Sequence, residues 1–134
     1  MLEYNQALLE KWSNNGPKFA FGDTMVDIGA DNQDVIVLGA DLAKSLDVYK
    51  YGEHYPDRFF NLGICEQNMI GVACGMAKEG KIPVATTFAT FASMRSCEQI
   101  RAGMGYMKMN VKVVGGYAGL MLGTLGNSHY AIED

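Results

Sequence analysis

Four short runs of apolar and β-branched residues, each bounded by polar or glycine-containing turns, predict buried strands. They cover residues 35–39, 59–63, 82–87 and 111–114. Their apolar character is continuous rather than alternating, which is typical of parallel strands that are covered on both faces. We therefore expect a sheet of four parallel strands.

Apolar residues recur at helical spacing between these runs. The predicted helices span residues 4–12, 18–29, 66–78 and 93–107, with a breaker cluster, Asn14 to Pro17, between the first two. The last helix would carry four apolar residues on one face, namely Cys97, Ile100, Met104 and Met107.

Helices that alternate with strands indicate βαβ units with right-handed crossovers. The expected fold class is α/β, a doubly wound parallel sheet with helices on both faces, in one domain over residues 1–134. Residues 130–134 resemble the start of a helix, and four strands without a closing helix would leave an apolar face uncovered. We therefore expect a domain truncated before its natural end, or one that packs on a partner.

The helix predicted over residues 66–78 carries Gly71 and Gly75 on one stripe. A glycine inside a helix costs up to about 1 kcal/mol relative to alanine. The pair therefore predicts that another backbone packs closely against this stripe.

Composition narrows the class of protein. With 134 residues, 49% apolar and 19% charged, the chain can form one domain with a real core, which excludes disorder. Eleven basic and fifteen acidic residues give a net charge of −4 without a basic stripe, which argues against nucleic-acid binding. No apolar run approaches the roughly 20 residues that cross a bilayer, and acidic residues stand where a signal peptide is basic. We expect a cytoplasmic protein.

The cysteines do not suggest a metal site. Cys65, Cys74 and Cys97 form no CxxC pair, and only two histidines could join them. We expect buried, reduced thiols and no metal ligands in this chain.

Ligands of open α/β sheets bind beyond the carboxyl ends of the strands. Each predicted strand is followed by residues that can bind or react: Asp41 and Ser45, then Glu66, then Phe88 and Phe91, and last a glycine-rich stretch up to His129. A carboxylate, two aromatic rings and a histidine at one edge predict a site for a flat polar ring.

These residues also have structural explanations. Glu66 near a helix start would complement the helix dipole, and Phe88 and Phe91 would fit a core. His129 alone is uninformative, and neither GxGxxG nor GxxxxGK[ST] occurs. The residues by themselves leave both interpretations open.

The block DRFFNLGICEQNM at 57–69 resembles the RFxNxGIxEQNM signature of the thiamine-diphosphate-binding transketolase family. Further blocks match the family in the same order: GADLAKS at 39–45, GKIP at 80–83, TTFATF at 86–91, EQIR at 98–101, NVKVVG at 110–115 and HYAIED at 129–134. The resemblance covers nearly the whole chain and is greatest to the C-terminal subunit of split, two-chain transketolases.

The resemblance implies the pyrimidine-binding domain of an enzyme that transfers a two-carbon ketol unit from a ketose (phosphate) to an aldose or aldehyde acceptor. Glu66 matches the glutamate that hydrogen-bonds N1′ of the cofactor's aminopyrimidine and so activates the cofactor. Phe91 matches the aromatic residue that stacks on the pyrimidine. Phe88, Asp41 and Ile64 would complete the cofactor-binding residues.

The residues expected to bind the sugar depart in part from the family pattern. His129 and Ser45 match substrate-contacting residues. Lys18 stands where an arginine usually grips the sugar phosphate, and Tyr117 replaces a histidine. Leu125 falls where transketolases place an aspartate that binds an acceptor hydroxyl. We therefore expect a substrate whose acceptor end is less hydroxylated or unusual, rather than the common pentose phosphates.

The family's diphosphate site, a GDG motif with later asparagines that hold a divalent metal, is not matched; only Gly22-Asp23-Thr24 occurs. The implied cofactors are thiamine diphosphate and a Mg²⁺ or Ca²⁺ ion held by a partner chain. That partner would be an N-terminal transketolase-like subunit, in a hetero-oligomer with two copies of each chain.

Two alternatives stay open. The chain could be a 1-deoxyxylulose-5-phosphate synthase-like or α-keto-acid dehydrogenase β-type subunit, since these share the glutamate and a similar domain. It could also be a non-catalytic scaffolding remnant of the fold.

Overall fold

The computed structural model describes residues 5–133. It contains one sheet of four strands, in the order β2-β1-β3-β4: β1 (Val35–Gly39), β2 (Phe59–Asn61), β3 (Ile82–Phe88) and β4 (Lys112–Gly116). Each neighbouring pair is parallel. Because β2 and β3 lie on opposite sides of β1, the winding reverses at β1, and the predicted doubly wound parallel sheet is confirmed.

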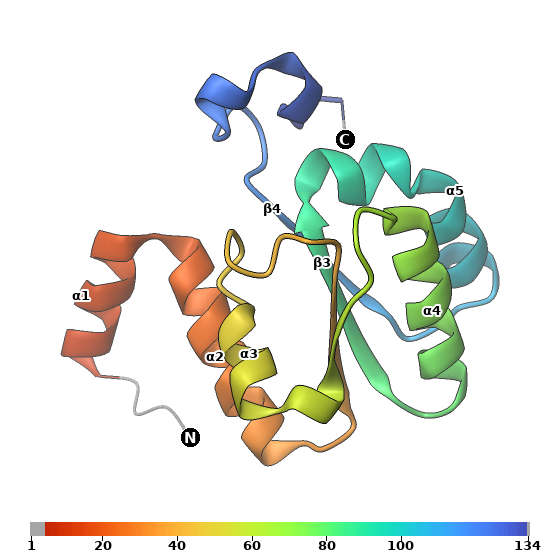
Figure 1. Cartoon of the computed structure of the whole chain (residues 1–134), viewed down its shortest axis with the longest axis horizontal. Coiled ribbons are helices and arrows are strands. Elements are labelled where there is room, and N and C mark those ends of the chain that lie inside the picture. Colours follow the sequence, from red (N-terminus) through yellow and green to blue (C-terminus); the bar gives the residue numbers. More distant parts are fainter. Residues whose placement is uncertain (1–4, 134) are drawn as a thin grey trace.

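Helices cover both faces of this sheet (Figure 1). On one side lie α2 (Pro17–Asp31) and α3 (Tyr49–His54), with α1 (Gln6–Asn15) packed on α2. On the other side lie α4 (Glu66–Lys78) and a helical segment made of η2 (Phe91–Arg95), α5 (Cys97–Ile100) and η3 (Arg101–Tyr106). None of the helices in residues 5–133 is both long and apolar enough to cross a membrane.

The alternation of side chains along β1 divides the core into two layers. Val35 and Val37 face a cluster that contains Met25, Val48 and Tyr51. The neighbouring residues of β1 face the opposite cluster, which consists of Ile36, Leu38, Ala40, Met69, Ile70, Ala73, Ala85 and Val111. All five residues of β1 are buried, which explains why the sequence run is apolar throughout.

The boundary between the first two helices follows from local chemistry. The side chain of Asn5 accepts a hydrogen bond from the backbone N–H of Leu8 and caps the start of α1. Gly16, with φ 94°, ends α1, and Pro17 begins α2. The predicted breaker cluster lies at this junction.

For the helix predicted over residues 93–107, the set of residues expected on one face is wrong. The segment is helical, but η2 and η3 are π-helical, so each of their turns holds more residues than an α-helical turn. An α-helical spacing therefore does not keep its residues on one face. Ile100 and Met104 pack against the core, whereas Cys97 is exposed and Met107 is 53% exposed.

Two further expectations are corrected. Residues 130–133 form no helix; Ala131 instead pairs with Gly119 through two backbone hydrogen bonds of 3.0 Å. Gly71 and Gly75 are exposed, and a Cβ atom at either position would meet nothing within 4 Å in the described part of the chain. The close-packed backbone predicted at this stripe is therefore not supplied by residues 5–133.

The structure also adds an element that the sequence pattern did not reveal. The short helix α3 follows the loop after β1, and its Tyr51 is fully buried. The hydroxyl of Tyr51 donates to the carbonyl oxygen of Val35 over 2.6 Å, which ties α3 to the first strand.

Candidate functional site

The loops that follow the four strands meet at the carboxyl edge of the sheet, the upper edge in Figure 1. The sequence-predicted residues Asp41, Glu66, Phe91 and Tyr117 follow β1, β2, β3 and β4 in turn. The segment after β4 lies over the same edge and carries His129. The fold therefore assembles the candidate site from segments that are distant in the sequence.

Glu66 is the first residue of α4, and its side chain is only 1% exposed. Its Oε2 accepts a hydrogen bond from Nη1 of Arg95 over 2.7 Å, and Oε1 accepts one from the hydroxyl of Thr87 over 3.4 Å. A buried carboxylate is costly unless it is paired and hydrogen-bonded. The ion pair with Arg95 and the start of the helix compensate that cost.

Arg95 connects Glu66 to the predicted stacking residue. Its guanidinium carbon lies 3.9 Å from the centre of the Phe91 ring, and the Arg95 side chain is 41% exposed. Both residues belong to the single turn η2, four positions apart. Cation–π contacts of this kind are favourable within about 6 Å of the ring centre.

Four rings pack together beside this pair. The ring of His129 lies 5.3 Å from Phe91 and 6.2 Å from Phe88, both in edge-to-face geometry. Tyr117 meets Phe88 edge to face at 5.3 Å, and the two phenylalanines are 6.1 Å apart. We call these four residues the aromatic cluster; it brings two predicted cofactor-binding residues into contact with two predicted substrate-binding residues.

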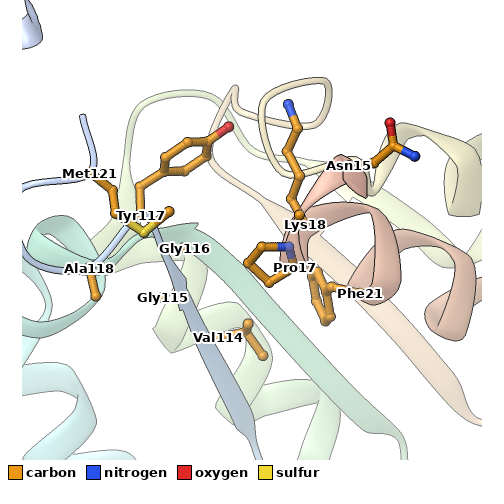
Figure 2. A pocket seen from close by; sticks show the side chains of 11 residues that line it. Asn15, Pro17, Lys18, Phe21, Val114, Gly115, Gly116, Tyr117, Ala118 and Met121 are labelled. Atoms are coloured by element: carbon orange, nitrogen blue, oxygen red, sulfur yellow. The ribbon is translucent and has the colours of Figure 1, made fainter. Parts of the chain in front are cut away.

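A cavity of about 420 Å³ lies between the start of α2 and the end of β4. Figure 2 shows Lys18 and Tyr117 at this cavity, with their polar ends turned to the same side, while Phe21 and Val114 line its deeper part. The hydroxyl of Tyr117 donates to the backbone carbonyl of Ser45 over 3.1 Å. The predicted substrate residues Lys18, Ser45 and Tyr117 are therefore neighbours in space.

The other predicted residues lie outside these contacts. Asp41 is exposed with φ 61°, and its backbone N–H donates to the side-chain oxygen of Asn61 over 2.9 Å. Ile64 is 74% exposed, and Leu125 is 51% exposed in the segment after β4. These three residues are exposed and do not belong to the aromatic cluster.

Sequence reasoning missed two residues of the site, Arg95 and Thr87. Each carried a weak signal in the sequence. Arg95 is a cation one helical turn after Phe91, and Thr87 is one of two hydroxyl residues near the end of a strand that is otherwise apolar. Only the fold shows that both of them contact Glu66.

Comparison with known proteins identifies the family. The family profile "Transketolase, pyrimidine binding domain" matches residues 18–134. The chain belongs to the transketolase family. Its sequence-based identification with the pyrimidine-binding domain of C-terminal transketolase subunits is confirmed.

Similar proteins include a candidate transketolase C-terminal section of Methanocaldococcus jannaschii, 43% identical over 119 residues, 89% of this chain and 38% of that protein. The 6-deoxy-6-sulfo-D-fructose transketolase subunit SqwH of a Clostridium species is 33% identical over 97% of this chain and 40% of its own length. A solved structure, described as a split gene transketolase in an inactive beta4 tetramer, is 46% identical with a TM-score of 0.73, over 87% of this chain and 37% of that one. The chain thus spans about two fifths of the length of these relatives.

Family membership implies dependence on thiamine diphosphate. The groups at the edge fit the aminopyrimidine end of this cofactor, because a buried carboxylate, Glu66, and a flat aromatic ring, Phe91, both contact the side chain of Arg95. Within residues 5–133, no group of three or more His, Cys, Asp or Glu side chains could hold a metal ion.

The residue nearest to a GDG-like pattern, Asp23, has a structural role instead. Its carboxylate accepts hydrogen bonds from Lys11, Lys50 and Trp12 at 2.7, 2.8 and 3.1 Å. Burial by itself would raise the pKa of Asp23, but these three donors hold it at about 2. The network joins α1, α2 and α3.

Proposed function

We propose that this chain supplies the pyrimidine-binding half of a thiamine-diphosphate-dependent enzyme that transfers a two-carbon ketol unit from a ketose to an aldehyde acceptor. The observation that carries the proposal is the buried carboxylate of Glu66 next to the Arg95–Phe91 stack at the ligand-binding edge. A carboxylate and an aromatic face are the two partners that a flat ring with N–H donors requires.

Bound thiamine diphosphate supplies the carbon nucleophile that holds the two-carbon unit between donor and acceptor. In this proposal, Glu66 binds N1′ of the aminopyrimidine and exchanges a proton at its carboxylate, from which burial excludes water. Thr87 orients Oε1 of that carboxylate, and Phe91 supports the face of the ring. In the same proposal, His129, which contacts Phe91, donates a hydrogen bond to a sugar oxygen.

The cavity beside Lys18 and Tyr117 supports a sugar with an anionic terminal group, since the ammonium of Lys18 lies at this cavity and can donate to an anion. The names of two relatives specify such sugars: SqwH acts on a sulfonated sugar, and a component of the apulose-4-phosphate transketolase of Phocaeicola vulgatus on a phosphorylated one. Leu125 has no polar group to bind an acceptor hydroxyl. We therefore propose an acceptor that is less hydroxylated at that position than the common pentose phosphates.

A partner chain completes the site in this proposal. An N-terminal transketolase-like subunit would hold the diphosphate together with Mg²⁺ or Ca²⁺, with two copies of each chain in the active oligomer. Two observations support this: a similar protein is named a transketolase C-terminal section, and the similar solved structure is described as a split gene transketolase that is inactive in its beta4 form.

A calorimetric titration tests the proposal. Thiamine diphosphate and Mg²⁺ are added to this chain alone, to a GDG-containing candidate partner alone, and to their mixture. We expect tight binding only in the mixture, followed by ketol transfer without release of carbon dioxide. Carbon dioxide released from a 2-oxo acid donor would assign a synthase-like or dehydrogenase-like reaction instead, and no binding in any sample would support the scaffolding alternative.

A matched pair of variants tests the role of Glu66. Glu66→Gln keeps the shape of the side chain and should lower kcat by about 10²- to 10⁴-fold, the usual contribution of a proton-transferring group. Glu79→Gln removes an exposed carboxylate at the other end of the same helix and should leave kcat unchanged. Equal activity of both variants and the wild type would contradict the role of Glu66.

A further inference from the structure

Arg95 contacts both residues on which the proposed cofactor site depends. Its Nη1 donates to Oε2 of Glu66 over 2.7 Å, and its guanidinium carbon lies 3.9 Å from the Phe91 ring centre. We infer that Arg95 holds the place of the aminopyrimidine ring in the cofactor-free chain and leaves it when the ring binds. The inference rests on the proposed function.

The chemistry of the two groups supports this exchange. A guanidinium is a flat cation with N–H donors along its edge, and it stacks on aromatic faces. An aminopyrimidine protonated at N1′ is also a flat cation, with an N–H donor at N1′ and its amino group on the opposite side of the ring. Each of them would lie over Phe91 and donate to Glu66, so the two groups compete for one position.

The surroundings of Phe91 restrict where a second flat group could stack. His129 and Phe88 already contact the ring, at centroid distances of 5.3 and 6.1 Å. The guanidinium at 3.9 Å covers a further part of the same ring. A ring that is to contact both Phe91 and Glu66 therefore meets Arg95 first.

The charges explain why Glu66 needs Arg95 in the cofactor-free chain and why Arg95 has to leave before Glu66 can exchange a proton. Glu66 is 1% exposed, and an unpaired carboxylate at that depth would be strongly unfavourable. Arg95 neutralises it, yet an arginine cannot give up its proton, so the pair has no proton to exchange. The 41% exposure of the Arg95 side chain gives the guanidinium a path to solvent once another cation takes its position.

The first test uses the free cofactor fragment 4-amino-5-hydroxymethyl-2-methylpyrimidine, titrated into the full chain by calorimetry. Arg95→Met should lower the dissociation constant by about tenfold or more, since apparent affinity rises with the fraction of molecules whose site is free. Lys78→Met, which removes an exposed cation at the far end of α4, should leave it unchanged. Glu66→Gln should weaken binding in both backgrounds.

The outcomes separate the two hypotheses. If the wild type binds the fragment and the affinity of Arg95→Met is equal or lower, the inference about Arg95 is overturned while the proposed function stands. If neither the wild type nor Arg95→Met binds the fragment, the proposed function fails and the inference fails with it.

A second measurement needs only the wild-type chain, in case Arg95→Met does not fold. The chain has three arginines, whose side-chain N–H signals can be followed by NMR and assigned through their bonds to the assigned backbone. Addition of the fragment should move the Arg95 signal toward that of exposed Arg101. Arg58, bonded to the carbonyls of Gly29 and Asn32 at 3.0 and 3.1 Å, should not change. An unchanged Arg95 signal at saturation would overturn the inference.

Discussion

The hydroxyl of Tyr117 donates a hydrogen bond over 3.1 Å to the backbone carbonyl of Ser45, 72 positions earlier in the chain. The bond joins the end of β4 to the loop after β1, across the edge at which the proposed cofactor site lies. Tyr117 adopts φ 57°, a left-handed conformation that is unfavourable for a bulky side chain. Its hydrogen bond and its contact with Phe88 offset that cost, so the tyrosine stabilises the edge of the site.

Replacing Tyr117 with phenylalanine tests this contribution. Tyr117→Phe keeps the ring contact and removes only the hydrogen bond, so the free energy of unfolding should fall by about 0.5–1.5 kcal/mol. Urea denaturation measures the change. Tyr106→Phe, at a side chain that is 87% exposed, is the control and should have no effect. Equal stability of the two variants would contradict the role of this bond.

Much of the fold was predictable because it depends on burial. β1 and α4 have the predicted bounds. β1 is buried on both faces and therefore reads as one continuous apolar run, and the start of α4 at Glu66 follows the loop that ends at Cys65. The segment 91–106 was not predictable from spacing, because its π-helical turns change which residues share a face. α3 is too short, at six residues, to produce a periodic signal.

The candidate site was predictable only as far as strand ends could be located. Glu66, Phe91 and His129 follow predicted strands, so their meeting at one edge follows from the topology. The role of Arg95 depends on a contact with Glu66, 29 positions away, and no local pattern specifies such a contact. The cavity next to Lys18 is lined by residues from both halves of the chain, so no local pattern in the sequence specifies it either.

Asp23 should make the stability of the chain depend on acid pH. Its pKa of about 2 in the folded chain lies below the ordinary value of 3.8, because Lys11, Lys50 and Trp12 donate to its carboxylate in spite of burial, which alone would raise it. The stabilisation is therefore complete above about pH 4 and is lost as the pH falls from about 4 to about 2.

The variant Asp23→Asn tests this effect. It should lower the free energy of unfolding at pH 7 by about 1 kcal/mol, a value reduced for solvent screening because Lys11 is half-exposed, and should flatten the acid dependence. Asp34→Asn, which breaks an exposed pair with Lys81, is the control and should change stability little. Urea denaturation between pH 2 and pH 7 compares them, and parallel pH profiles of Asp23→Asn and wild type would contradict the expectation.

Two glycines should respond to alanine in opposite directions. A Cβ atom at Gly29 would lie 2.6 Å from ring atoms of both Tyr51 and Tyr55, and Tyr51 is held by its bond to Val35. Gly29→Ala should therefore destabilise the chain by about 1–3 kcal/mol, as overpacking does. Gly71→Ala meets open space at an exposed position of α4 and should stabilise the isolated chain by up to about 1 kcal/mol. Thermal unfolding compares the two, and effects of the same sign would contradict the packing described here.

Gly71→Ala also tests whether the backbone predicted to pack against this stripe belongs to another chain. If the stripe of Gly71 and Gly75 meets a partner backbone, the methyl group that stabilises the isolated chain should weaken its association with the N-terminal subunit. Analytical ultracentrifugation of the mixture measures this association. Unchanged association would place the partner contact elsewhere on the surface.

Lys18 provides a test of the proposed anionic sugar. A charged hydrogen bond contributes about 1.5–3 kcal/mol, so Lys18→Met should raise KM for a phosphorylated ketose by about 10- to 100-fold with little change in kcat. Erythrulose, an uncharged ketose, should be unaffected by this substitution. Lys18→Arg keeps the charge and allows bidentate hydrogen bonding to a phosphate, and should retain or improve KM for the phosphorylated sugar. Steady-state kinetics of the two-chain complex measure these effects, with Lys78→Met as the control for loss of a positive charge. An equal rise in KM for both ketoses in Lys18→Met would contradict the assignment of Lys18 to the anionic group.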